Sequence, residues 1–237
     1  MKPPIPNNES ARLEALRQYR VLDSAPEHSF DAITELASFI CESPIALVSL
    51  VDAERQWFKS TVGLAATETP RDFSFCAHAI VQGSLLVVED AMADERFADN
   101  PLVTGDPRIR FYAGAPLITP EGHGLGSLCV IDRKPQKLCA ERAAALEKLA
   151  ALVVTQLELR RVSYALAEAA TNIKTLSGLL PICSHCKAIR SDKDYWQSVE
   201  MYVKARTEAV FSHGICPDCA KKHYPEFYEK SEMEKRQ

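Results

Sequence analysis

Four cysteines near the C-terminal end of this 237-residue sequence stand in two CxxC pairs. Cys183 and Cys186 form the first pair, and Cys216 and Cys219 form the second after 29 intervening residues. Each short turn lets two thiolates converge on one ion while amides of the turn donate to the sulfurs. The two pairs together therefore predict a structural zinc site with four cysteine ligands. Redox dithiols or coincidental pairs are the alternatives, and two nearby histidines could serve as substitute ligands.

The segment around these pairs predicts a small zinc-ribbon-like module over residues 181–228, followed by a tail over 229–237. Within the module we expect a helix over 198–205 and a strand over 209–211. A module of fewer than about 60 residues buries too little surface to fold reliably alone. Zinc binding would supply the missing free energy of folding.

Residues 139–180, just before this module, predict one long helix. Apolar residues recur there every seven positions, with a second series three positions later, which is the a/d pattern of a helix that supercoils against a partner. The first series is Leu152, Leu159, Leu166, Ile173 and Leu180, and the second is Val162, Ala169 and Leu176. We therefore expect a homodimer through a coiled coil over 152–180, whereas residues 140–151 are expected to pack on the preceding domain.

The front of the chain predicts an α+β domain over residues 10–151, after a disordered lead over 1–9. Five short segments, the first of them apolar and rich in β-branched residues, predict a mostly antiparallel sheet with helices before and after it. The expected strands are 45–51, 56–62, 85–88, 111–118 and 126–131, and the expected helices are 10–19, 29–40 and 73–81.

Several separated segments of this domain resemble the GAF domain family. They are Arg55-Gln56-Trp57-Phe58-Lys59-Ser60, Glu68-Thr69-Pro70-Arg71 with Ser74-Phe75-Cys76-Ala77-His78-Ala79-Ile80, and Gly126-Ser127-Leu128-Cys129-Val130-Ile131-Asp132. The likeness covers about residues 10–158 and extends to GAF domains fused to bacterial sensor kinases and cyclic-dinucleotide enzymes. It implies a GAF-like antiparallel sheet flanked by helices and a sensor of bacterial signal transduction, but it names no ligand.

The resemblance also implies where a ligand would lie. In this family the cavity lies between the sheet and the segment that here covers 69–112, so residues near an unknown small ligand would be Phe58, Arg71, Phe75, Cys76, His78 and Tyr112. Cys76 and His78 lie two positions apart on a short helix and so point in different directions, and a structural role is the alternative for each. The bilin-attachment and cyclic-nucleotide patterns of the family are absent, and no cofactor is assigned to this cavity.

The C-terminal region, over about 176–228, looks like a cysteine-rich tail at the end of bacterial PAS, GAF and receiver-domain proteins. This resemblance supports the zinc site but does not identify the process or partner on which the tail acts. Residues 171–237 hold 11 Lys/Arg against 9 Asp/Glu, and the whole chain carries a net charge of -4. The sequence therefore lacks the excess of basic residues that binding to nucleic-acid phosphates needs.

The sequence also lacks a membrane span and the apolar core of a signal peptide, which predicts a cytoplasmic protein. We expect a sensor or adaptor dimer and not an enzyme, in which a signal in the GAF cavity reaches an unknown signalling protein through the helix and the zinc module. One alternative is a GAF-type methionine sulfoxide reductase that uses Cys76 and Cys129 as a thiol pair. The other is a zinc-containing transcriptional regulator. Cys41, Cys129 and Cys139 are otherwise expected to be buried small residues.

Overall fold

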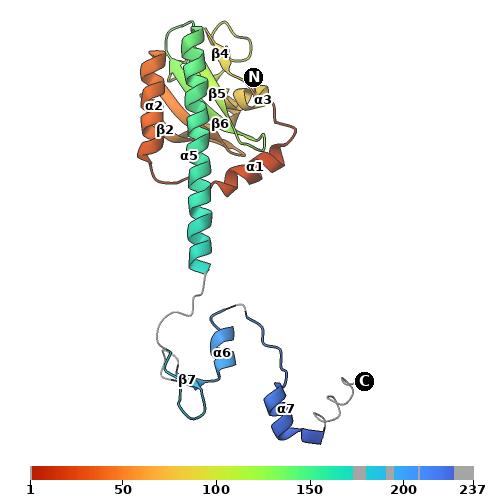
Figure 1. Ribbon diagram of the computed structural model, residues 1–237. Coiled ribbons are helices and arrows are strands. Elements are labelled where there is room, and N and C mark those ends of the chain that lie inside the picture. Colours follow the sequence, from red (N-terminus) through yellow and green to blue (C-terminus); the bar gives the residue numbers. More distant parts are fainter. Residues whose placement is uncertain (1, 173–179, 191–194, 208, 227–237) are drawn as a thin grey trace. The chain divides into compact units, whose positions relative to one another are not determined.

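A computed structural model describes residues 2–172, 180–190, 195–207 and 209–226 (Figure 1). The chain divides into two compact units, Met1–Ala167 and Glu168–Gln237. The two units are described separately below. Among the described residues, no helix is both long and apolar enough to cross a lipid bilayer.

The first unit is built on a six-stranded antiparallel sheet in the order β3-β2-β1-β6-β5-β4. All five expected strands are present within two residues at each end. The sixth strand, β3, was not predicted because two of its three residues are polar and the third is a proline. It lies at one edge of the sheet. The strands are β1 (Ile45–Val51), β2 (Arg55–Val62), β3 (Glu68–Pro70), β4 (Leu86–Val88), β5 (Phe111–Ile118) and β6 (Gly124–Asp132).

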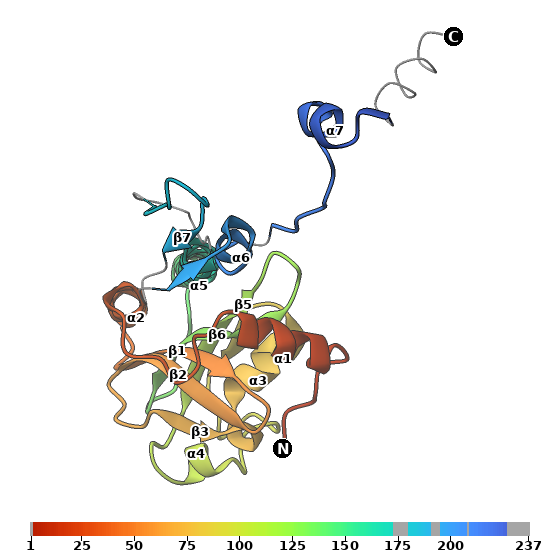
Figure 2. The same cartoon turned by 90° about the horizontal axis from the view of Figure 1, so that it is seen from below.

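Both faces of this sheet are covered, and the alternation of side chains along β1 divides the core into two clusters. Ala46, Val48 and Leu50 pack in one cluster, whereas Ile45 and Leu47 pack in the other. Figure 2 shows α2 and α5 on one side of the sheet and α3 and α4 on the other. The helices of this unit are α1 (Glu9–Gln18), α2 (His28–Cys41), α3 (Phe75–Gln82), α4 (Pro101–Thr104) and α5 (Ala140–Asn172), with the 3₁₀ turn η1 (Arg71–Phe73) before α3.

Helix α1 is held against the sheet by a buried arginine. Arg12 is 1% exposed, and its Nη1 atom donates to the carbonyl oxygens of Val51 at 2.7 Å and Gly124 at 3.4 Å. Glu9 balances this charge, because its carboxylate accepts from Arg12 Nε at 2.9 Å and from Arg71 Nη1 at 2.6 Å. One carboxylate therefore pairs with two largely buried guanidinium groups and offsets one of their two charges.

A second ionic network ties the sheet to α2 and α5. Lys59 is the extra residue of a β-bulge, because Ser60 pairs with Val48 and Phe58 pairs with Ser49. Its buried Nζ atom donates to Glu27 Oε1 at 2.7 Å, and Arg160 of α5 binds the same oxygen. A single carboxylate thus joins a strand of the sheet to the long helix.

Helix α5 has two different apolar surfaces. Its first half packs on its own domain, as expected, and this packing continues beyond residue 151 to Leu157, which is fully buried. Three residues of the heptad series are exposed in its second half: Leu159 by 58%, Val162 by 57% and Leu166 by 69%. Residues 173–179 of the expected helix lie outside the described residues. The coiled coil stays a prediction.

After α5, the described part of the second unit contains a short hairpin and two helices. They are β7 (Ile189–Arg190), β8 (Trp196–Gln197), α6 (Val199–Lys204) and α7 (Pro217–His223). The expected helix over 198–205 is confirmed as α6. The expected strand over 209–211 was wrong, because those residues have no regular structure. Their apolar side chains are exposed, Val210 by 90% and Phe211 by 41%, and no strand among the residues that the structure describes pairs with them.

Candidate functional site

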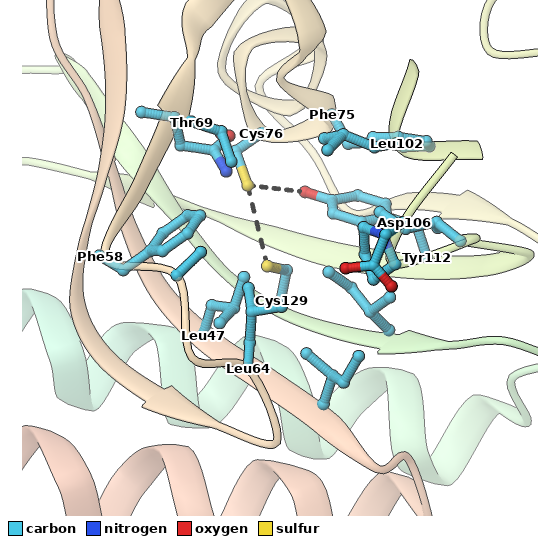
Figure 3. Close-up of a pocket in the computed structure, with 16 residues that line it drawn as sticks. Leu47, Phe58, Leu64, Thr69, Phe75, Cys76, Leu102, Asp106, Tyr112 and Cys129 are labelled. Atoms are coloured by element: carbon cyan, nitrogen blue, oxygen red, sulfur yellow. Dashed lines mark hydrogen bonds between the residues drawn. The ribbon is translucent and has the colours of Figure 1, made fainter. Parts of the chain in front are cut away.

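A cavity of about 240 Å³ lies between α3 and the face of the sheet that α3 covers (Figure 3). Strands β1, β2, β5 and β6 form its floor, α3 lies over it, and the segments 64–69 and 102–109 close its sides. The lining residues are mostly apolar, which is the usual composition of a small-molecule site. They are Ile45, Leu47, Gln56, Phe58, Leu64, Ala66, Thr69, Phe75, Cys76, Leu102, Asp106, Pro107, Ile109, Tyr112, Cys129 and Ile131.

Four of the six residues that the sequence placed near a ligand lie in this wall: Phe58, Phe75, Cys76 and Tyr112. Arg71 does not, because it donates to Glu9 and to the carbonyl oxygens of Asp52 and Ala53. Arg71 thus contacts α1 through Glu9 and is not among the residues that line the cavity, and a binding role for it stays an untested prediction.

His78 is also not among the lining residues of the cavity. Its ring packs edge-on against Phe97, with the ring centroids 4.9 Å apart. It lies on α3 two positions after Cys76, and the different directions expected for the two side chains explain why only Cys76 reaches the cavity. The binding roles of the four lining residues stay predictions.

Sequence reasoning missed most of the remaining wall, although one alternative function paired Cys129 with Cys76 as thiols. Residues 129 and 131 of β6 face the cavity, and residues 128 and 130 face the opposite cluster. The period of two along the strand could have identified Cys129 once Ile131 was assigned to the cavity side. Cys41 and Cys129 are buried as expected, whereas Cys139 is exposed because it lies in the loop just before α5.

Tyr112 makes two polar contacts beside the cavity. Its hydroxyl donates to the sulfur of Cys76 at 3.3 Å and lies 3.2 Å from the hydroxyl oxygen of Ser127. Gly114 makes room for this arrangement, because a Cβ atom there would collide with the Tyr112 hydroxyl. Burial, together with the negative charge that Cys76 and Cys129 can carry, raises the pKa of Tyr112 well above its ordinary value. Tyr112 is therefore a neutral hydrogen-bond donor.

Two thiols meet in the same wall. The sulfurs of Cys76, from α3, and Cys129, from β6, lie 3.8 Å apart (Figure 3). Burial raises the pKa of the Cys76 thiol, but hydrogen bonds with Cys129 and Ser127 outweigh burial, and the net effect lowers the pKa. For Cys129, the hydrogen bond to Cys76 and then burial raise the pKa. Cys76 is the more easily ionised thiol of the pair.

The charges around the cavity limit what it can bind. Among its lining residues there is one carboxylate, Asp106, and no lysine, arginine or histidine. Thr69 also faces the cavity, and its buried hydroxyl has no hydrogen-bond partner among the described residues. A buried hydroxyl of this kind favours a ligand that supplies the missing partner. The wall suits a small, mainly apolar molecule that is uncharged or positively charged.

The four tail cysteines form two separate half-sites in the described part of the second unit. The first CxxC pair lies in a turn that the amide of Lys187 closes by donating to the carbonyl oxygen of Cys183 at 3.0 Å. Amide hydrogen bonds, first from Cys186, lower the pKa of the Cys183 thiol. Cys216 lies at the N-cap position of α7, and the amide of Cys219 is the main cause that lowers the pKa of Cys216.

These half-sites have the amide-to-sulfur hydrogen bonds that zinc-bound thiolates need, so the donor set fits the metal. The described residues contain no group of three or more metal-binding side chains, so the convergence of the two pairs stays a prediction. Zinc bound there would have a structural role.

The fold and the cavity define an α+β domain that can enclose a small ligand. The family model of the GAF domain matches residues 25–157, and the chain belongs to the GAF domain family. It is a GAF-domain signalling sensor, as the sequence resemblance implied.

Among characterised relatives, the chain is similar to a cyclic di-GMP phosphodiesterase of Pseudomonas aeruginosa. The two are 48% identical over 164 residues, which cover 68% of this chain and 28% of the relative. The chain thus matches little more than a quarter of that enzyme.

Solved structures include similar folds. The GAF domain of an Acinetobacter phosphoenolpyruvate-protein phosphotransferase is 18% identical, with a TM-score of 0.49, and the match covers 66% of this chain and 96% of that domain. The free methionine-R-sulfoxide reductase of Neisseria meningitidis is 19% identical, with a TM-score of 0.48, over 65% of this chain and 92% of the reductase.

The phosphodiesterase relative corrects one expectation from the sequence. We expected a protein that is not an enzyme, whereas a relative with 48% identity is named for an enzymatic activity and points to an enzymatic function. The expectation was wrong because it rested on finding no catalytic domain in the chain. A GAF domain can belong to an enzyme without holding its catalytic residues.

Proposed function

We propose that this chain takes part in the turnover of cyclic di-GMP and that its GAF unit is the sensory part, with a small, mainly apolar ligand bound in the cavity. The observation that carries the sensory role is the cavity of about 240 Å³ that the chain's own side chains leave open in the middle of the unit. Support for the link to cyclic di-GMP comes from the 48% identity to the phosphodiesterase.

The cavity itself is a poor site for cyclic di-GMP. That dinucleotide carries two phosphodiester anions, and anions in proteins are bound by cationic side chains or helix N-termini. No cationic residue lines the cavity, and the carboxylate of Asp106 would repel a phosphate. We therefore assign sensing and hydrolysis to separate sites, with the cavity controlling the rate of hydrolysis elsewhere.

An exchange of segments tests this proposal. The matching segment of the Pseudomonas aeruginosa enzyme is replaced with that of this chain, and the formation of the linear dinucleotide from cyclic di-GMP is measured. We expect hydrolysis to respond to the low-molecular-weight fraction of a bacterial extract. Leu64→Trp should abolish the response, because the larger side chain would fill the cavity that Leu64 lines.

Met92→Trp is the matched control, since Met92 is 58% exposed and does not line the cavity. This variant should keep the full response. A chimera that hydrolyses cyclic di-GMP with no response to the extract, or one whose response survives Leu64→Trp, would contradict the sensory role of the cavity.

Helix α5 is the proposed route from the cavity to the output. Phe58 lines the cavity, and Lys59, its neighbour on β2, shares the Glu27 carboxylate with Arg160 of α5. A displacement of β2 by a ligand would therefore act on α5 through the two ion pairs that share the Glu27 carboxylate. We propose that α5 pairs with a second copy of the chain, because its exposed apolar residues continue a heptad repeat.

Leu159→Lys combined with Leu166→Lys should convert the dimer to a monomer. Both residues are more than half exposed, so the substitutions should cost the single chain little stability, whereas in the paired helix they would bury two charges per chain. Light scattering coupled to size-exclusion chromatography measures the mass. Ala167→Lys is the control, because residue 167 lies next to the seam in sequence but on another side of the helix. A double variant that stays dimeric would exclude this seam as the interface.

The tail is the proposed output element. We infer that Cys183, Cys186, Cys216 and Cys219 together bind one structural zinc ion, and that the zinc-bound module presents a surface to another signalling protein. The fit of the two half-sites supports this proposal, since each has a thiol whose pKa the amides of its own turn lower.

A further inference from the structure

The cavity wall contains a pair of thiols that the proposed sensing of a ligand does not use. Cys76 is 1% exposed and Cys129 is fully buried, and their sulfurs are 3.8 Å apart. The two residues come from different elements, α3 and β6, and lie 53 positions apart in the sequence. The fold itself therefore brings them together.

The distance between the sulfurs is short enough for a disulfide to form with modest movement. A disulfide has an S–S distance of about 2.05 Å, so the sulfurs must approach each other from 3.8 Å. Both side chains border the empty volume of the cavity, which gives them room to turn. A thiol in a tightly packed core would lack that freedom.

The environment also makes the two sulfurs unequal. Tyr112 donates a hydrogen bond to Cys76 at 3.3 Å, which stabilises a thiolate there. The thiolate is the form that reacts with oxidants. Cys129 has the higher pKa and stays a thiol, because its hydrogen bond to Cys76 and its burial favour the neutral form. Cys76 is thus suited to react first and Cys129 to resolve the product.

We propose that Cys76 and Cys129 form a reversible disulfide when a hydroperoxide enters the cavity, so that the GAF unit contains an oxidation-sensitive site. The Cys76 thiolate attacks one peroxide oxygen, the O–O bond breaks, and the released alkoxide or hydroxide takes a proton and leaves as alcohol or water. The resulting sulfenic acid condenses with the Cys129 thiol, which forms the S–S bond and releases one water. Two electrons pass from the thiol pair to the peroxide, and a dithiol reductant returns them.

Oxidation would change the cavity as well as the thiols. Closing the S–S bond draws both sulfurs away from their present positions in the wall and alters the contact of Cys76 with the Tyr112 hydroxyl. The site therefore couples the redox state to the shape of the cavity. It does not depend on the identity of the ligand or on the link to cyclic di-GMP.

Mass spectrometry of the full chain tests the proposal. The reduced protein is treated with hydrogen peroxide, free thiols are blocked by alkylation, and the protein is digested without reductant. We expect a linked peptide that joins Cys76 to Cys129, lighter by two hydrogen atoms than the two peptides together, and its loss on adding a phosphine reductant. In Cys129→Ala the linked peptide should disappear and Cys76 should accumulate as a sulfenic acid that dimedone traps.

Cys41→Ala is the matched control, because Cys41 is equally buried but belongs to the cluster on the other face of the sheet. This variant should form the linked peptide as the wild type does. The wild-type result stands even if a variant fails to fold. The proposal is overturned if Cys76 and Cys129 remain fully alkylated at peroxide concentrations that oxidise the exposed Cys139, or if Cys76 links to a tail cysteine instead.

Discussion

Glu9→Gln should lower the free energy of unfolding of the GAF unit by about 2 kcal/mol at pH 7. Partial burial raises the pKa of Glu9, but hydrogen bonds from Arg12 and Arg71 outweigh it and lower the pKa to about 2, from an ordinary value of 4.5. A change of this size corresponds to about 3 kcal/mol, and water at the partly exposed carboxylate reduces it to about 2 kcal/mol. Denaturant unfolding followed by circular dichroism measures the loss.

The same interaction predicts a dependence on pH. The folded pKa lies below the unfolded value, so the contribution of Glu9 is fully present above pH 4.5 and is lost as the pH falls towards about 2. Wild type and Glu9→Gln should therefore differ at pH 7 and converge at the acid end of this range. Equal differences at pH 7 and pH 3 would contradict the assignment.

Glu14→Gln provides the control on the same helix. Glu14 pairs with Arg17, but both side chains are more than 60% exposed. Exposed pairs of this kind contribute about 0–1 kcal/mol, so this variant should unfold almost as the wild type does. The difference between the two variants in free energy of unfolding separates the loss of the Glu9 ion pairs from a general effect of removing a negative charge from α1.

Removal of zinc should abolish the folded structure of the tail while leaving the GAF unit intact. The second unit has few buried apolar side chains in its described part, among them Ile189 and Tyr202. Zinc binding contributes about 10–16 kcal/mol to the folding of zinc-finger peptides, which is far more than so small a core supplies. Hydrogen exchange should therefore show lost protection across α6 after chelation, with β1 and β6 unchanged.

Cysteine substitutions test whether the two half-sites share one ion. Cys183→Ser combined with Cys219→Ser removes one ligand from each pair, and elemental analysis should find the zinc content falling from one ion per chain to none. Cys139→Ser should keep the zinc, because Cys139 is exposed but belongs to the GAF unit. Zinc that persists in the double variant, or protection of α6 that survives chelation, would refute a shared structural site.

The sheet could be predicted from the sequence because its central strands carry strong local signals. The run Ile45–Val51 is apolar on both faces, which is the pattern of a strand buried on both sides. β3 lacks such a signal, since Thr69 and Pro70 have no apolar pattern and only their pairing with β2 makes them a strand. Edge pairing of this kind depends on the rest of the sheet.

The cavity was only partly predictable. The family resemblance placed Phe75, Tyr112 and Arg71 near the cavity, and the first two line it whereas Arg71 does not. Its partner Glu9 lies 62 positions away, and a contact over that separation leaves no local trace in the sequence. The pairing of Cys76 with Cys129 was considered only through the likeness to GAF-type reductases, because no local pattern links two residues that lie 53 positions apart.

The alternation of side chains across the sheet has a consequence for how such sensors can diversify. Along β1, Ile45 and Leu47 line the cavity, whereas Ala46 and Val48 pack in the cluster shared with α2 and α5. Ligand specificity and the contacts of the output helix are therefore encoded in neighbouring but separate positions of the same strand. Substitutions at one set can give the sensor a new ligand while the other set keeps the existing output.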